Sequence, residues 1–272
     1  MPELPEVETV RKALKSQIQD RIINSVDVLY DKIIEYPNVS DFKEKIKNQK
    51  INDINRKGKW LIFELDDYCM LSHLRMEGKY FIKESEPILK HEHVIFNLDD
   101  GTTLRYNDTR KFGKMHLIEK QNLYIQKPLN ELGLEPWDEN LDSDFLKDKY
   151  SNKNLPIKTV LLDQSIITGI GNIYADEILF LSKINPLKKA KVLKKKELDN
   201  IIKYTKDVLN RAIEAGGTTI RSYESSEGVH GRFQTNLLVH NREKKQCPEC
   251  GKTIVKIRVN GRGTYYCSNC QK

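Results

Sequence analysis

Apolar residues along the chain follow two different periods, and the change of period separates a β-rich first half from a helical second half. The first segment is an exception, because apolar residues recur there at helical spacing and predict a helix that begins near Pro5: Val7, Val10, Leu14 and Ile18. From about residue 22 to residue 120, short apolar runs alternate with turns. Residues 94–98 and 102–106 flank Asp99-Asp100-Gly101, which is typical of a β-hairpin. This pattern predicts an α+β chain whose first half is a β-sandwich or barrel with the first helix attached.

Helical spacing dominates the second half. Residues 121–150 contain two prolines and a glycine, and they are expected to connect the two halves. Residues 218–236 are polar and lack periodicity, which is typical of a loop. Between these segments three helices are predicted, from Ile157, from Asn172 after a Gly-Ile-Gly break, and over residues 198–213.

Four of the five cysteines form two C-x-x-C pairs near the end of the chain. Cys247 and Cys250 form the first pair, and Cys267 and Cys270 follow after sixteen intervening residues. Two such pairs supply the four thiolates of a structural zinc site and leave no position open for a catalytic water. Two disulfides are the alternative, which a cytosolic chain disfavours. Cys69 lies in an apolar run and is expected to be a buried core thiol.

Residues 256–259 alternate between the cysteine pairs and precede Asn260-Gly261-Arg262-Gly263, so a hairpin with Arg262 at its tip is expected. Such a zinc ribbon suits contact with a DNA backbone or groove, and it suits protein contacts equally.

The formal net charge of +7 is unevenly distributed. Residues 1–150 hold 24 Lys and Arg against 28 Asp and Glu, a balance of −4, whereas residues 151–272 hold 22 against 11, a balance of +11. Basic surface attracts phosphate, although a run of lysines is more often a solvated face. No apolar stretch reaches the roughly 18 residues of a membrane-spanning helix, and the start does not resemble a secretory signal, so a cytoplasmic protein is expected.

The N-terminus offers a possible nucleophile. Removal of Met1 would expose Pro2 as a secondary amine, which condenses with a sugar aldehyde to a permanently cationic iminium, an electron sink for elimination. An α-amino group titrates near pH 8, so much of it is free base at neutral pH. Glu3 and Glu6 place carboxylates beside it for proton transfer. Taken alone, however, these residues more often just open a helix.

His91 and His93 flank Glu92 on a predicted strand, where alternate side chains share a face. This spacing is compatible with a metal site, but ordinary polar strand positions are the simpler interpretation.

Several motifs occur in a fixed order along nearly the full chain: M-P-E-L-P-E-V-E-T-V at 1–10, R-K-G-K-W at 56–60, H-L-R-M-E-G at 73–78, N-D-T-R-K-F-G at 107–113, G-I-G-N-I-Y-A-D-E at 169–177 and G-G-T-T at 216–219. With the cysteine pairs, they resemble the formamidopyrimidine-DNA glycosylase family. Arg75 departs locally, because the family commonly has a small residue there. The resemblance implies one structural zinc ion, no redox or nucleotide cofactor, and four segments: an N-terminal β-sandwich catalytic domain (1–130), a linker (131–150), a helix-two-turn-helix domain (151–239) with a lesion-capping loop (218–236), and a zinc-ribbon finger (240–272).

The resemblance also implies a catalytic set of Pro2, Glu3, Lys59 and Arg262. Pro2 is the implied nucleophile at the anomeric carbon, and Glu3 is the acid that assists opening of the deoxyribose. Glu6 would support proton transfer. Lys59 would lie near the scissile phosphates, and Arg262 would bind phosphate from the zinc hairpin.

Extrusion of a base leaves a gap in the duplex. By resemblance, Met76 and Phe112 stack into this gap while Arg110 pairs with the orphaned base. Judged on the pattern alone, Met76 and Phe112 would be core residues. Further DNA contacts are implied for His93, Lys158, Asn172 and Tyr223.

The resemblance therefore predicts a monomeric, nucleoid-associated base-excision-repair enzyme that acts on double-stranded DNA. It would remove 8-oxoguanine and formamidopyrimidines, and cleave the strand by β,δ-elimination through an iminium on Pro2. The alternatives are a glycosylase for oxidised pyrimidines, similar to endonuclease VIII, and a catalytically silent DNA-binding zinc-ribbon protein. Leu4 and the gap-filling set favour the purine-directed branch, and the retention of Pro2, Glu3 and Lys59 argues against a silent protein.

Overall fold

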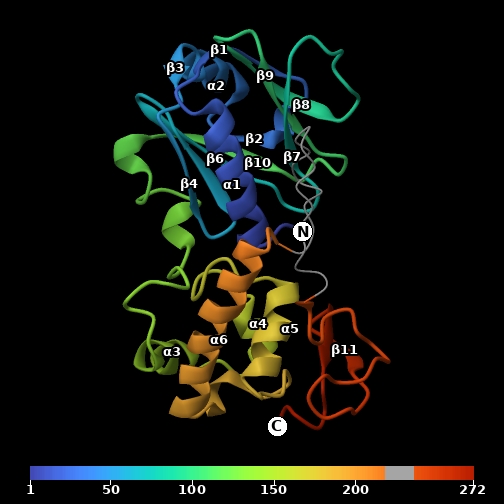
Figure 1. Cartoon of the computed structure of the whole chain (residues 1–272). Coiled ribbons are helices and arrows are strands. Elements are labelled where there is room, and N and C mark those ends of the chain that lie inside the picture. Colours follow the sequence, from blue (N-terminus) through green and yellow to red (C-terminus); the bar gives the residue numbers. More distant parts are fainter. Residues whose placement is uncertain (218–235) are drawn as a thin grey trace. The chain divides into compact units, whose positions relative to one another are not determined.

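A computed structural model describes residues 1–217 and 236–272 (Figure 1). These residues form two compact units, and each is described by itself. Residues 1–130 with Gly216 and Gly217 make up the first unit, and residues 131–215 with 236–272 make up the second. None of the described helices is both long and apolar enough to cross a lipid bilayer.

The first unit contains ten strands and two helices: α1 (Leu4–Ile18), β1 (Ile22–Val28), β2 (Ile34–Tyr36), α2 (Val39–Ile46), β3 (Gln49–Lys50), β4 (Asp53–Lys57), β5 (Trp60–Glu64), β6 (Tyr68–His73), β7 (Lys79–Lys83), β8 (Glu92–Leu98), β9 (Thr103–Asn107) and β10 (Lys114–Glu119). The strands form two five-stranded sheets, in the orders β3-β1-β8-β9-β7 and β2-β10-β6-β5-β4. Every neighbouring pair is antiparallel except β2 with β10. The expected β-sandwich is confirmed, and the predicted hairpin is β8 with β9.

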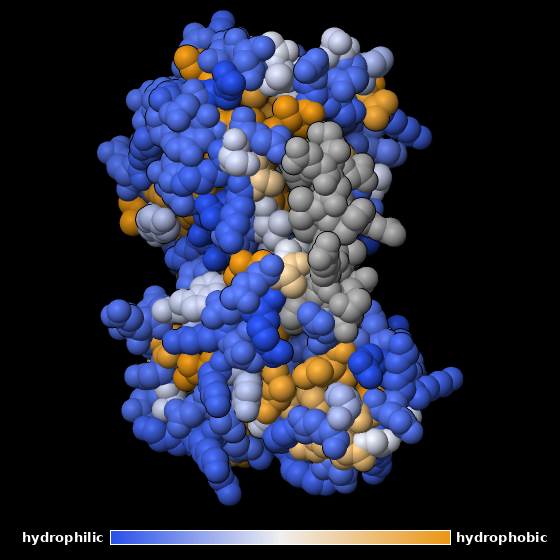
Figure 2. Space-filling view, in the orientation of Figure 1, coloured by the Kyte–Doolittle hydropathy of each residue, from blue (hydrophilic) through white to orange (hydrophobic). Residues whose placement is uncertain are grey.

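One apolar core lies between the two sheets and α1. The four residues whose spacing predicts the first helix are all buried in it, each at most 1% exposed: Val7, Val10, Leu14 and Ile18. Full burial of such a side chain contributes roughly 1.5–3 kcal/mol. The core therefore fixes α1, and with it the N-terminus of the chain. Outside the core, hydrophilic residues cover most of the molecular face drawn in Figure 2.

The second unit is built from α3 (Ser143–Tyr150), α4 (Ile157–Leu161), α5 (Asn172–Leu181), α6 (Lys195–Glu214), and a hairpin of β11 (Val255–Val259) and β12 (Arg262–Tyr266). Short 3-10 turns occur in both units, at Asp31–Ile33, Lys120–Asn122, Leu129–Glu131 and Ala190–Val192. The three predicted helices correspond to α4, α5 and α6.

The segment 131–150, expected to be a linker, contains α3 and belongs to the second unit. Leu146 and Tyr150, four residues apart, are buried on one side of α3. The Asp142 side chain caps the helix by accepting a hydrogen bond from the Phe145 amide at 2.7 Å. The apolar pattern missed this helix because two turns supply too few periodic positions.

The hairpin of the cysteine module forms as predicted, with one detail changed. Asn260 and Gly261 make the two-residue turn, and both have positive φ, 44° and 75°. This backbone matches the hairpin turns that Asn-Gly favours. Arg262 is thus the first residue of β12, paired with Val259, rather than a residue of the turn itself.

Candidate active site and nucleic-acid interface

The N-terminus of the chain is held at the first turn of α1. Pro2 is buried, and Glu3 caps the helix in a capping box with Glu6. The Glu3 amide donates to Glu6 Oε2 at 2.9 Å, and the two residues are only 2% and 4% exposed. Gly217 lies against the same carboxylate, since a Cβ added there would be 2.8 Å from Glu6 Oε1. Pro2, Glu3 and Glu6, the residues predicted to carry the covalent chemistry, therefore lie together at the start of α1.

Lys59 is the second residue of the two-residue turn between β4 and β5, and it is 6% exposed. Arg56 joins this turn to α1, because its Nη1 donates to the Gly58 carbonyl at 2.9 Å and its Nε to Glu8 Oε2 at 3.2 Å. Burial would raise the pKa of Glu8, but the Arg11 and Arg56 guanidinium groups outweigh it and the pKa lies below its usual range. A charged Glu8 therefore ties the helix bearing Pro2 to the turn bearing Lys59.

The loops of the predicted gap-filling residues emerge at the same edge of the sandwich. Residues 74–78 connect β6 to β7, and residues 108–113 connect β9 to β10. The end of β6 pairs with the start of β10 at His73 and Lys114, and the start of β7 pairs with the end of β9 at Lys79 and Asn107. Each loop thus crosses between the same two sheets, and the register places the loops side by side.

Met76 and Phe112 are exposed, at 36% and 49% respectively. Placing them in the core on their apolar pattern alone is therefore wrong. Arg110 is also exposed, and its guanidinium carbon lies 4.8 Å from the centre of the Phe112 ring. Arg75, the departure from the family pattern, has a positive φ of 52°, and its side chain is exposed. A left-handed backbone favours glycine, and the exposed position leaves room for the arginine side chain.

His93 was expected to contact DNA. It is 4% exposed, and its Nε2 hydrogen-bonds to the Asp108 carbonyl at 2.9 Å. Burial lowers its pKa. Within the described residues, the one group of three or more side chains arranged to hold a metal ion is the four-cysteine cluster. His93 lies on β8, whereas His91 lies in the turn before it.

In the second unit, Asn172 begins α5 and contacts the zinc hairpin. Its Nδ2 donates to the Gly263 carbonyl at 3.0 Å, next to Arg262. Asn172 Oδ1 is buried without a hydrogen-bond partner. Two residues predicted to bind phosphate are thus adjacent, although they are 90 positions apart in the sequence.

Lys158, another predicted DNA contact, has no exposed surface. Its ammonium donates to Asp176 Oδ1 at 2.5 Å and to the Asn172 carbonyl at 2.8 Å. Asp176 Oδ2 lies 2.7 Å from His240 Nδ1. A direct phosphate contact by Lys158 does not fit this geometry. Its charge instead belongs to a buried network that joins α4, α5 and the segment before the zinc hairpin.

Glu177, beside Asp176, fixes that segment. Its carboxylate accepts the backbone amides of Leu238, Val239 and His240 at 2.7, 3.0 and 2.8 Å. Burial raises the pKa of Glu177, and the three amide bonds oppose that rise. The polypeptide entering the cysteine module is therefore anchored on α5.

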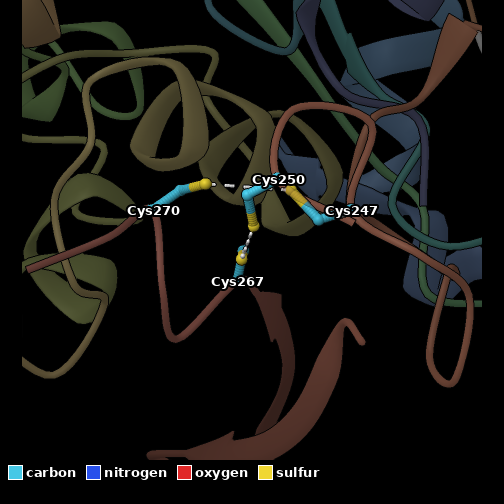
Figure 3. A group of neighbouring side chains, drawn as sticks. All are labelled: Cys247, Cys250, Cys267 and Cys270. Atoms are coloured by element: carbon cyan, nitrogen blue, oxygen red, sulfur yellow. Dashed lines mark hydrogen bonds between the residues drawn. The ribbon is translucent and has the colours of Figure 1, made fainter. Parts of the chain in front are cut away.

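The four cysteines of the module converge on one point (Figure 3). Their sulfur atoms all lie within 4.8 Å of one another, with Cys247 3.9 Å from Cys270 and Cys250 3.5 Å from Cys267. Zinc–sulfur bonds of about 2.3 Å in a tetrahedron put sulfurs about 3.8 Å apart. The Lys252 amide lowers the pKa of the Cys250 thiol to about 6, which favours a thiolate ligand. The geometry fits one zinc ion and not two disulfides, and Cys69 is buried as expected.

Tyr223 and nearly all of the predicted lesion-capping loop lie outside the described residues. Sequence reasoning did not single out four acidic residues that organise the two units, although all four lie inside quoted motifs: Glu8, Asp108, Asp176 and Glu177. For Asp108 a signal existed, because an aspartate that opens a turn often accepts amides two to four residues ahead. Glu8 also pairs with Arg11 three residues on, but Arg56 and the partners of Asp176 and Glu177 lie too far along the chain for any local signal.

Comparison with known proteins covers most of the chain. Residues 1–115 match the family described as the formamidopyrimidine-DNA glycosylase N-terminal domain. Residues 132–224 match the formamidopyrimidine-DNA glycosylase H2TH domain, and residues 244–272 match a zinc finger found in FPG and IleRS.

Full-length relatives agree. A formamidopyrimidine-DNA glycosylase of Oceanobacillus iheyensis is 45% identical over 273 residues, covering 100% of this chain and 98% of the relative. The one from Bacillus subtilis is 46% identical over 273 residues, covering 100% and 99%. Among solved structures, a Lactococcus lactis FPG variant in complex with a Fapy-dG containing DNA superposes with a TM-score of 0.93 at 37% identity, covering 100% of both chains.

Proposed function

Because the chain belongs to the formamidopyrimidine-DNA glycosylase family, we propose that its N-terminal unit excises oxidised purines from double-stranded DNA with Pro2 as the nucleophile. The chain is a base-excision-repair DNA glycosylase and AP lyase with a DNA partner and a structural zinc. The observation that carries the role of Pro2 is the buried first turn of α1, where Glu3 and Glu6 flank it.

The reaction begins after removal of Met1. The Pro2 amine attacks C1′ of the damaged nucleotide, and the base leaves with the electron pair of the glycosidic bond and takes up a proton. Glu3 protonates the ring oxygen of the sugar, which opens to an iminium between C1′ and the Pro2 nitrogen. Glu6, bonded to the Glu3 amide, supports this proton transfer.

The iminium then acts as an electron sink. Loss of a C2′ proton expels the 3′ phosphate by β-elimination, and a further proton loss expels the 5′ phosphate by δ-elimination. Water finally hydrolyses the iminium, which releases the sugar fragment and restores the amine. The positive charge of Lys59, held beside α1 by Arg56 and Glu8, stabilises the departing phosphates.

The other site residues bind the distorted duplex. Met76 and Phe112 stack in the gap left by the extruded base, and Arg110 pairs with the orphaned base. Asn172 and Arg262 bind phosphate from the second unit, where zinc holds the hairpin that presents Arg262. The enzyme is proposed to act as a monomer, in the cytoplasm at the nucleoid.

Borohydride trapping tests the nucleophile. The purified protein is mixed with a duplex containing 8-oxoguanine opposite cytosine, reduced, and digested for mass mapping. A crosslink on the N-terminal peptide at Pro2 is expected. A matched control retains an extra residue before Pro2, which converts the Pro2 amine to an amide, and it should give no crosslink at Pro2 while still binding DNA.

Two results would contradict the proposal. A crosslink on a lysine with none at Pro2 would show a different nucleophile. Trapping on an oxidised-pyrimidine duplex, with none on 8-oxoguanine or a formamidopyrimidine, would move the enzyme to the pyrimidine-directed alternative.

A further inference from the structure

A buried carboxylate lies at the base of the turn that carries Arg110 and Phe112. Asp108 has no exposed surface, and it accepts three backbone amides of this turn. Oδ1 accepts from Arg110 at 3.0 Å, whereas Oδ2 accepts from Phe112 at 2.9 Å and from Gly113 at 2.8 Å. Hydrogen bonds to an ionised acceptor are stronger than neutral ones. The two oxygens thus hold different parts of the turn, and Oδ1 holds Arg110.

Two residues fix the backbone of Asp108: His91, which precedes β8, and His93 on β8. The Asp108 amide donates to the His91 carbonyl at 2.9 Å, and the Asp108 carbonyl accepts from His93 Nε2 at 2.9 Å. Lys111, between the two exposed residues, has a positive φ of 59°. A lysine in the left-handed region is strained, so the turn needs the Asp108 bonds to keep its shape.

The same place also fixes the Met76 loop. The Tyr106 hydroxyl, 3.5 Å from Asp108 Oδ2, is fully buried. A Cβ added at Gly78 would lie 2.2 Å from this hydroxyl, and one added at Gly113 would lie 1.8 Å from it. The loop that carries Met76 and the turn that carries Arg110 are far apart in the sequence, but both pack against the Tyr106 hydroxyl.

We propose that Asp108 is a positioning residue that aims Arg110 at the orphaned base, and so sets how binding and excision depend on the base opposite the lesion. The proposal rests on the proposed function, in which Arg110 pairs with that base. A guanidinium recognises a base edge only within hydrogen-bond distance and angle limits, so an unanchored turn loses discrimination before it loses affinity. Tyr106 acts with Asp108 by holding the two loops together.

The test is binding of Asp108→Asn to duplexes with a tetrahydrofuran abasic-site analogue opposite C, A, G or T. The asparagine keeps one acceptor, which can serve the Phe112 and Gly113 amides while its NH₂ group faces the Arg110 amide. The ratio of affinities between the best and worst opposite base should fall by about three- to tenfold. It should approach the ratio shown by Arg110→Ala, and affinity for undamaged duplex should not change.

Matched controls separate positioning from general damage. Asp163 accepts the Ser165 amide at 3.1 Å in a comparable turn, so Asp163→Asn should keep the wild-type ratio. Tyr106→Phe should lower the ratio in the same direction. Tyr80→Phe should not, because that hydroxyl donates to Ser72 Oγ at 2.7 Å and not to the turn.

Equal loss of affinity for all four duplexes in Asp108→Asn and Tyr106→Phe would overturn the proposal. If Arg110→Ala also keeps the wild-type ratio, the role of Arg110 fails and that of Asp108 fails with it. If Asp108→Asn does not fold, Tyr106→Phe decides. Wild-type protein that binds the abasic analogue but excises no base contradicts the proposed reaction alone, since the affinity ratios still test Asp108.

Discussion

Replacement of Asp176 by asparagine should strongly destabilise the second unit. The Lys158 ammonium and the Asp176 carboxylate are 2.5 Å apart, and neither side chain has any exposed surface. In Asp176→Asn, the ammonium keeps the Asn172 carbonyl but loses the carboxylate charge that lies 2.5 Å from it. Breaking one side of a buried pair costs about 3–5 kcal/mol, against a total stability of about 5–15 kcal/mol for a typical domain.

The network also predicts an asymmetry between its two ends. Lys158→Met removes the cation but leaves the Asp176 carboxylate hydrogen-bonded to His240 Nδ1 at 2.7 Å, so the carboxylate keeps a polar partner. Lys158→Met should therefore cost less than Asp176→Asn, about 2 kcal/mol. The exposed pair of Lys195 and Asp144, 3.4 Å apart with side chains 69% and 82% exposed, is the matched control. Asp144→Asn should change stability by less than about 0.5 kcal/mol.

Urea unfolding of zinc-loaded protein measures these differences. The chain has two tryptophans, Trp60 in the first unit and Trp137 in the second. In a Trp60→Phe background, Trp137 fluorescence reports the second unit, because its Nε1 donates to Asn210 Oδ1 on α6 at 2.9 Å. The reasoning is refuted if Asp176→Asn lies within about 1 kcal/mol of the reference, or if Lys158→Met costs more than Asp176→Asn.

Three further outcomes are expected. Cys267→Ser should abolish the bound zinc measured by metal analysis and weaken DNA binding by at least about tenfold, whereas unchanged affinity would separate the zinc hairpin from DNA binding. Burial lowers the pKa of His73 to about 3, so below a pH of about 6.5 the unfolded chain binds a proton that the folded chain does not. The free energy of unfolding should therefore decline as the pH falls below about 6.5. His73→Asn should flatten this decline, as measured by urea unfolding at several pH values. Gly217→Ala should slow excision, because the residue has φ +82° and the added Cβ would lie 2.8 Å from Glu6 Oε1. Its control, Gly101→Ala, has φ +84° with nothing within 4 Å of the added Cβ and should lower stability alone. Equal excision rates in the two variants would exclude a role for the Glu6 contact.

The features that the sequence predicts correctly depend on residues that are close together along the chain. The buried face of α1 follows from four apolar residues within twelve positions, and the β11–β12 turn follows from Asn260-Gly261. The zinc ligands follow from two pairs with fixed internal spacing. In each case the physical cause acts within one or two turns of backbone, so the pattern and the structure agree.

The internal supports of the site could not be predicted in this way. Glu8 reaches Arg56 across 48 positions, and Asp176 reaches His240 across 64. Glutamate and aspartate at such positions look like ordinary surface charges until the fold brings their partners together. Their burial is costly without a partner, and so each of these contacts depends on the tertiary structure rather than on any local preference.

The basic second half of the chain shows why charge alone does not define a nucleic-acid interface. Lys158 is neutralised inside the protein by Asp176, and Lys183 and Lys188 form ion pairs with Glu249 and Glu197 at the surface. A phosphate would have to displace a carboxylate from each of these lysines. Arg262 differs from these lysines in its position. It is the first residue of β12, and the carbonyl of its neighbour Gly263 accepts a hydrogen bond from Asn172 at the start of α5. Arg262 is exposed, and among the described residues it forms no ion pair that a phosphate would have to break. This is the physical reason to expect the larger loss of DNA affinity from Arg262→Ala than from any of the paired lysines.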